Sequence, residues 1–151
     1  MATHALTGIA FELHQELNEP SDPSQSKIGL WLQFNAGKIN NKISKSYEVV
    51  SGEYEPLIED DEKDILKSIY YVSYYNDKAR DALVSSTTSS NILSIRDDVS
   101  SVSFVNAKET AKEFYNISKD YELRTNDLVN LYKHNRSGPR DPQENVTGFK
   151  Y

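Results

Sequence analysis

Residues 56–84, PLIEDDEKDILKSIYYVSYYNDKARDALV, decide the fold of this chain. Their apolar residues recur at intervals of three, four and seven, which is the spacing of one face of an α-helix. Pro56 suits the first turn of such a helix, and the acidic residues after it suit the positive end of the helix dipole. The apolar face consists of Leu57, Ile58, Ile65, Ile69, Val72, Ala79 and Leu83. The pattern predicts a first long helix that runs to about Val84.

A second long helix is predicted to end near His134-Asn135. Its stripe contains small and polar side chains, so it suits packing against another helix better than burial in a large core. The stripe consists of Ala107, Ala111, Phe114, Ser118, Tyr121, Thr125, Leu128 and Tyr132. Between the two long helices, the ten Ser and Thr residues of Val84 to Ser103 indicate a loop, with one apolar anchor at residues 92–95.

Two short helices are predicted before residue 45. The first carries Leu6, Ile9, Ala10, Leu13 and Leu17 on one face, with Thr3 as a possible cap. The second begins at Ser24 or Ser26 and carries Ile28, Trp31, Leu32, Ile39 and Ile43. Gly37 in its middle costs roughly 1 kcal/mol relative to alanine, which indicates close helix packing or a kink. Residues 47–56 are expected to form a connection with a brief extended piece.

These elements predict an all-α protein with a helical domain over residues 1–135 and an extended tail over residues 136–151. The tail has no hydrophobic period, contains two prolines and two glycines, and ends in Phe149 and Tyr151. A segment that cannot fold alone keeps two aromatic residues in water only at a cost, so a partner's groove is expected to receive them. The alternative is that the tail folds back on its own domain.

Composition narrows the range of functions. A length of 151 residues suits one domain, and the lack of cysteine excludes disulfides and thiolate metal sites. The apolar runs are too short to span a bilayer. A net charge of −6 argues against wrapping of nucleic acid. Residues 53–64 hold seven acidic side chains and one lysine, so this segment accounts for the acidic excess.

Motifs for catalysis or metal binding are lacking, so no catalytic, cofactor or metal site is expected. The three histidines, His4, His14 and His134, share no ligand spacing. A calcium loop counted from Asp60 fails, because an isoleucine stands where glycine is needed and a tyrosine where the bidentate glutamate is needed. Glu12 and Glu16 lie one helical turn apart and could act as acid and base, but the sequence shows no third group converging on them.

The ten tyrosines are the most unusual feature of the composition. Tyr70, Tyr71, Tyr74 and Tyr75 cover nearly half the circumference of the first long helix. Tyrosine is favoured both at interfaces and in half-buried core positions, so both interpretations stay open.

The order of these parts resembles the helical head-to-tail adaptor, or connector, proteins of tailed bacteriophages. Three stretches, which together span most of the chain, carry the resemblance. They are residues 17–21 (LNEPS) leading into 28–32 (IGLWL) and 37–40 (GKIN), residues 98–102 (DVSSV), and residues 132–140 (YKHNRSGPR).

The resemblance implies a four-helix-bundle-like adaptor subunit without catalytic activity. Such subunits form a ring, usually twelvefold, between the portal protein and the tail or nozzle protein. The protein would be made in the host cytoplasm and would reside in the neck of the virion, where DNA passes through the ring without specific binding and no membrane is involved.

The resemblance also implies roles for particular residues. The tail would dock on the portal through Arg136, Pro139, Arg140, Phe149 and Tyr151. Neighbouring subunits would meet through Tyr70, Tyr71, Tyr74, Tyr75, Phe114 and Tyr121, because a head-to-tail ring needs two different complementary surfaces. Some acidic residues would line the channel and keep DNA from adhering. The candidates for this lining are Glu59, Asp60, Asp61 and Glu62.

Two other functions compete with the adaptor. A small acidic regulator could bind a host protein by displaying residues 53–64 as a mimic of phosphates, although that function leaves the aromatic end of the tail unexplained. An enzyme could use Glu12, Glu16 or His14 if these side chains faced a common pocket.

Overall fold

A computed structural model of the chain describes residues 2–93 and 98–137, with side chains described in 2–85 and 108–137. The helices in these ranges are α1 (Leu6–Glu16), α2 (Gln25–Phe34), α3 (Ala36–Ile43), α4 (Asp60–Leu93) and α5 (Asp98–Ser137). The strands are β1 (Thr3–His4), β2 (Glu48–Val50), β3 (Glu53–Glu55) and β4 (Ile58–Glu59). The described chain is therefore mostly helical, which confirms the all-α prediction in its coarse form.

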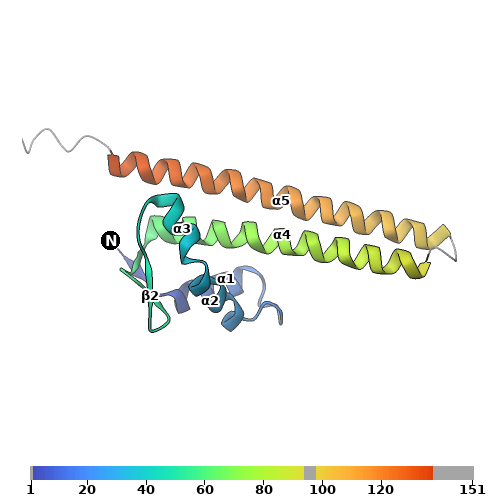
Figure 1. Cartoon of the computed structure of the whole chain (residues 1–151), viewed down its shortest axis with the longest axis horizontal. Helices are drawn as coiled ribbons and strands as arrows, with labels where there is room; N and C mark the ends of the chain where they lie inside the picture. Colours follow the sequence, from blue (N-terminus) through green and yellow to red (C-terminus); the bar gives the residue numbers. More distant parts are fainter. Residues whose placement is uncertain (1, 94–97, 138–151) are drawn as a thin grey trace, which may run out of the picture.

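The two long helices α4 and α5 form an antiparallel hairpin (Figure 1). With a rise of about 1.5 Å per residue, α4 is roughly 50 Å long and α5 roughly 60 Å long. Helices α1 to α3 and the short strands lie beside the end of the hairpin where α4 begins and α5 ends (Figure 1). We call this part, residues 2–59, the head. The other half of the hairpin extends beyond the head.

The strands make two small antiparallel pairs within the head. β1 pairs with β4, with Thr3 opposite Glu59, and β2 pairs with β3, with Glu48 opposite Glu55. The turn between β2 and β3 contains Gly52, whose positive φ of 83° favours glycine. The brief extended piece predicted between residues 47 and 56 is thus confirmed.

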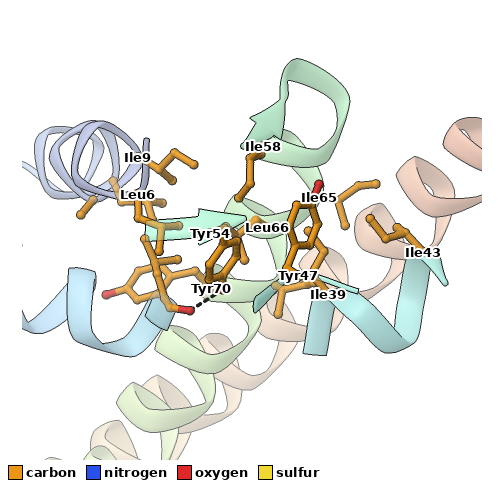
Figure 2. Close-up of a cluster of buried hydrophobic side chains, with 14 of the residues drawn as sticks. Leu6, Ile9, Ile39, Ile43, Tyr47, Tyr54, Ile58, Ile65, Leu66 and Tyr70 are labelled. Atoms are coloured by element: carbon orange, nitrogen blue, oxygen red, sulfur yellow. Dashed lines mark hydrogen bonds between the residues drawn. The ribbon is translucent and has the colours of Figure 1, made fainter. Parts of the chain in front are cut away.

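The hydrophobic core lies where the head meets α4 (Figure 2). The predicted inner face of α1 is confirmed, because Leu6, Ile9, Ala10 and Leu13 are buried. Two tyrosines fill the space between α3, the β2–β3 pair and α4: the rings of Tyr47 and Tyr54 are stacked with centroids 5.3 Å apart. The hydroxyl of Tyr54 donates to the carbonyl oxygen of Leu32, so a buried polar atom has its partner.

The predicted loop over residues 84–103 is wrong for most of its length, since α4 continues to Leu93 and α5 begins at Asp98. Serine and threonine are only a few tenths of a kcal/mol poorer than good helix formers, and this stretch contains neither glycine nor proline. Packing of one long helix against the other stabilises helical structure that local composition alone does not favour.

Helix α4 begins at Asp60 and not at Pro56. Residues 58 and 59 instead pair with β1, which uses Thr3 as a strand residue and not as a helix cap. The backbone N–H of Glu59 donates to the side chain of Glu62 at 3.0 Å, which is half of a capping box. Acidic residues do occupy the first turn of α4, as the dipole argument predicts.

The predicted second helix is divided at Asn35 into α2 and α3. The Asn35 side chain donates from Nδ2 to the carbonyl oxygen of Trp31 at 2.8 Å and so satisfies a carbonyl at the end of α2. Gly37 is not the site of close packing, because a Cβ atom there would meet nothing within 4 Å.

Alanine at Gly37 is therefore expected to raise the free energy of unfolding by about 0.5–1 kcal/mol, because it removes backbone freedom from the unfolded chain without a clash. The matched control, Gly52→Ala, is expected to lower it by about 1 kcal/mol or more, since its φ is positive and Gln33 Nε2 lies 3.3 Å from the added Cβ. Urea unfolding of both variants measures the two effects. A destabilised Gly37→Ala would show that this glycine has a packing role.

Candidate functional site

The carboxylate of Glu62 is the most extensively bonded charged group in the described chain. Its side chain is 0% exposed, and it accepts hydrogen bonds from Lys45 Nζ at 2.6 Å, from the Tyr47 hydroxyl and from the Tyr132 hydroxyl at 2.8 Å. Arg136 lies 3.7 Å away. Because these partners come from the head and from the end of α5, one carboxylate ties both to the start of α4.

The surroundings of Glu62 favour its charged form. Burial opposes ionisation, but the hydrogen bonds from Lys45, Tyr47, the backbone of Glu59 and Tyr132 outweigh it and lower the pKa of Glu62 to about 2. Burial and the bond to this carboxylate raise the pKa of Tyr132 to about 12. The carboxylate stays ionised and both tyrosines stay protonated at neutral pH.

Arg136 connects this network to the point where the tail begins. Its guanidinium pairs with the carboxylate of Glu59 and lies over the ring of Tyr132, 4.6 Å from the centroid. We call the group of Lys45, Tyr47, Glu59, Glu62, Tyr132 and Arg136 the Glu62 clasp. The sequence could reveal Glu62 only as a capping residue, because its partners lie between 15 and 74 positions away.

The clasp changes two of the roles expected from sequence. Glu62 was expected among the channel-lining residues but is fully buried, because it caps α4 and receives two tyrosine hydroxyls. Arg136 was expected in the extended tail but lies in the last turn of α5, where Glu59 of β4 and Glu62 of α4 hold it. Pro139, Arg140, Phe149 and Tyr151 lie outside the described residues.

The remaining channel candidates differ in their surroundings. Glu59 is 28% exposed and paired with Arg136, and Asp60 is paired with His4, which lowers the Asp60 pKa. Asp61 is exposed. Only Asp61 among the four candidates is both exposed and without a charged partner in the described part of the chain.

The candidate interface tyrosines form a continuous series of ring contacts within the chain. Tyr71 stacks on Tyr121 of α5 at 4.8 Å, and Tyr75 stacks on Tyr121 at 5.7 Å and on Phe114 at 6.2 Å. Tyr70 meets Trp31 edge to face at 5.1 Å. Tyr70 and Tyr71 are buried, so for these two the core interpretation holds, while Tyr74, Tyr75, Phe114 and Tyr121 are half-buried.

Glu12 and Glu16, the candidate acid and base, meet groups from α4. Lys67 Nζ pairs with both carboxylates, and the Tyr71 hydroxyl donates to Glu16. Burial opposes the charged forms of Glu16 and Lys67, but their mutual bonds outweigh it: the Glu16 pKa is lowered and the Lys67 pKa is raised. Both shifts move these groups away from proton exchange at neutral pH. His14 lies apart from them and bonds the carbonyl oxygen of Pro20 at 3.0 Å.

Sequence reasoning missed a groove of about 580 Å³ in the corner between α3 and the α4–α5 hairpin. Lys38, Asn41 and Lys42 of α3 form one wall, and the floor includes Ile69 and Val72 of α4. Three lining residues are cationic (Lys38, Lys42 and Arg80) and two are acidic (Asp77 and Glu122). The volume lies within the range of about 300–1,000 Å³ that is typical of ligand sites.

No protein-family model, curated protein or solved structure matches this chain. Among residues 2–93 and 98–137, no group of three or more His, Asp and Glu side chains could hold a metal ion. In the same residues, none of the helices is long and apolar enough to cross a membrane.

Proposed function

We propose that this protein is a structural head-to-tail adaptor of a tailed bacteriophage, a four-helix-bundle-like subunit that forms a ring between portal and tail. The observation that carries the proposal is the Glu62 clasp at the end of α5. It holds Arg136 two residues before the glycine-proline pair of the tail, at the head end of the hairpin. A tail that docks on a portal needs a fixed starting point, because disorder at its root would add to the entropy lost on binding.

The second support is the absence of a group suited to proton transfer in the network around Glu16. The pKa of Glu16 is lowered and the pKa of Lys67 is raised, as expected for a structural ion pair that holds α1 against α4. The proposed subunit therefore acts through its surfaces and tail.

The acidic segment supports the adaptor better than the acidic regulator. Within residues 53–64, Glu62 is buried, Glu59 is paired with Arg136, Asp60 bonds His4, and Glu53 accepts from the backbone of Leu6. A phosphate mimic needs its carboxylates free for a partner, and of the seven only Glu55, Asp61 and Asp64 are exposed without an ion pair in the described residues. In the adaptor, the exposed Asp61 remains available to repel DNA in the channel.

Removal of residues 145–151 is expected to abolish portal binding and to leave the urea unfolding midpoint unchanged, because the sequence predicts an extended tail here, outside the helical domain. The measurement is electron microscopy of the purified protein mixed with portal rings of the same virus, beside each component alone. The full-length chain is expected to add a symmetric layer to one end of the portal.

A matched control separates tail chemistry from tail length. Phe149→Ala/Tyr151→Ala keeps the length and removes the two aromatic anchors, and it is expected to lose portal binding as the truncation does. Unchanged portal binding by the truncated chain would contradict the docking role of the tail. No added layer at saturating concentration of the full-length chain would contradict the adaptor function itself.

A further inference from the structure

The β2–β3 pair carries two like charges opposite each other on one of its faces. Glu48 lies directly opposite Glu55, and both are exposed. Like charges directly opposite each other destabilise an antiparallel pair. Neither carboxylate has an ion pair or side-chain hydrogen bond within residues 2–93 and 98–137.

Side-chain alternation places Val50 and Glu53 on the same face as these two glutamates, opposite the face of the buried Tyr54. Val50 is 42% exposed. This face therefore combines two unpaired glutamates and an exposed valine with Glu53, whose carboxylate accepts from the backbone of Leu6 at the start of α1.

The groove beside α3 carries two like charges of the opposite sign. Lys38 and Lys42 lie four residues apart on one short helix, and like charges at this spacing destabilise a helix. Neither lysine makes an ion pair in the described chain, while the acidic lining residues are engaged: Asp77 by Arg80 at 3.5 Å and Glu122 by Lys119 at 2.8 Å. The groove therefore offers two ammonium groups without an ion pair beside an apolar floor, although Lys38 Nζ lies over the ring of Trp31, 5.1 Å from its centroid.

The β2–β3 face and the groove complement each other, because each offers charges of opposite sign beside an apolar surface. Two glutamates and a valine on one would meet two lysines and the apolar floor of Ile69 and Val72 on the other. In Figure 1, α3 lies against the long helices, while the strand labelled β2 lies at the outer edge of the head. Two different surfaces that complement each other make a head-to-tail contact between copies.

We propose that the β2–β3 pair of one subunit docks in the α3–α4–α5 groove of a second copy of this chain. The contact brings Glu48 and Glu55 to Lys38 and Lys42 and removes both repulsions at once. This inference rests on the proposed ring and identifies its subunit interface, which thus lies away from the buried tyrosines of α4.

The natural lack of cysteine makes disulfide crosslinking a direct test. Two single-cysteine proteins, Glu55→Cys and Lys42→Cys, are mixed at high concentration and low salt under mild oxidation. The mixture is expected to yield a crosslinked heterodimer that exceeds the homodimer of either protein. In the control mixture, a Gln15→Cys protein takes the place of the Lys42→Cys protein. Gln15 is an exposed residue of α1 outside the groove, so no excess of heterodimer is expected.

Charge reversal tests the chemistry of the same contact. Lys38→Glu, added to the Lys42→Cys protein, is expected to reduce the heterodimer about tenfold. Glu48→Lys, added to the Glu55→Cys protein, is expected to restore it. Equal yields with the Gln15→Cys control, homodimers alone, or no crosslink would each overturn the proposed contact.

Portal binding by full-length wild-type protein separates the two proposals. Portal binding without the crosslink overturns the groove contact and leaves the adaptor function standing. The crosslink without portal binding supports self-assembly through the groove and overturns the adaptor function.

Discussion

Glu62→Ala is expected to lower the free energy of unfolding by about 3 kcal/mol. The substitution leaves the hydroxyls of Tyr47 and Tyr132 without their acceptor and Lys45 without its carboxylate. It also removes the side chain that accepts the backbone N–H of Glu59 at the start of α4. The ammonium and guanidinium groups can still reach water, so the lost partners of the tyrosines account for most of the effect.

Urea unfolding followed by circular dichroism measures this loss. The matched control is Asp61→Ala, one residue earlier, where an exposed carboxylate without a charged partner in the described chain is expected to change stability by less than about 0.5 kcal/mol. Equal stabilities of the two variants would contradict the structural role of the clasp.

The pH dependence follows from the same carboxylate. Its folded pKa of about 2 lies below the ordinary value of 4.5, so its contribution is fully present above pH 4.5 and is lost as the pH falls towards 2. The stability difference between wild type and Glu62→Gln is therefore expected to shrink as the pH falls through this range. A difference that stays constant down to pH 2 would show that charge is not what Glu62 contributes.

Tyr71→Ala is expected to lower the free energy of unfolding by about 4 kcal/mol, in the range for deletion of a buried aromatic ring. Tyr71 is 9% exposed and stacks on Tyr121 of α5. Its hydroxyl donates to Glu16 at the end of α1. Loss of this ring leaves a cavity at the junction of α1, α4 and α5.

Tyr71→Phe separates the ring from the hydroxyl. It keeps the stacking and loses only the bond to a half-exposed carboxylate, so a loss of about 1 kcal/mol or less is expected. Thermal or urea unfolding of both variants gives the comparison. A phenylalanine variant as unstable as the alanine variant would show that the bond to Glu16, and not packing, holds this junction together.

Periodicity predicted the helices well where apolar residues repeat in register. In the stripe of α5, Ala111, Ser118, Thr125 and Tyr132 are buried, and the polar members have partners inside the hairpin. Ser68 and Thr125 share a hydrogen bond of 2.7 Å, and Ser118 bonds the carbonyl oxygen of Val72 at 3.1 Å. Small polar residues at helical spacing thus indicate close packing of helices, as the sequence suggested.

Local composition predicted the ends of helices poorly. The serine-rich stretch after Val84 is helical as far as Leu93, although its local helix propensity is weak. The second helix is divided at Asn35 because its side chain satisfies a carbonyl at the end of α2. Such effects depend on partners that a propensity scale does not contain.

The sequence by itself determined the helical class, the inner faces of α1 and α5, and the acidic start of α4, because each follows from spacing along one helix. The predicted face of α4 was correct at Ile65, Ile69 and Ala79, which are buried, but Leu57 lies before the helix and Leu83 is 48% exposed. Only the tertiary structure decided that Glu62 is buried, that Arg136 belongs to α5, and that Lys38 and Lys42 border a groove. These facts depend on residues that lie up to 74 positions apart and meet only when the hairpin closes on the head. Local spacing records the face on which a side chain lies, whereas the energy of a buried charge depends on which distant groups surround it.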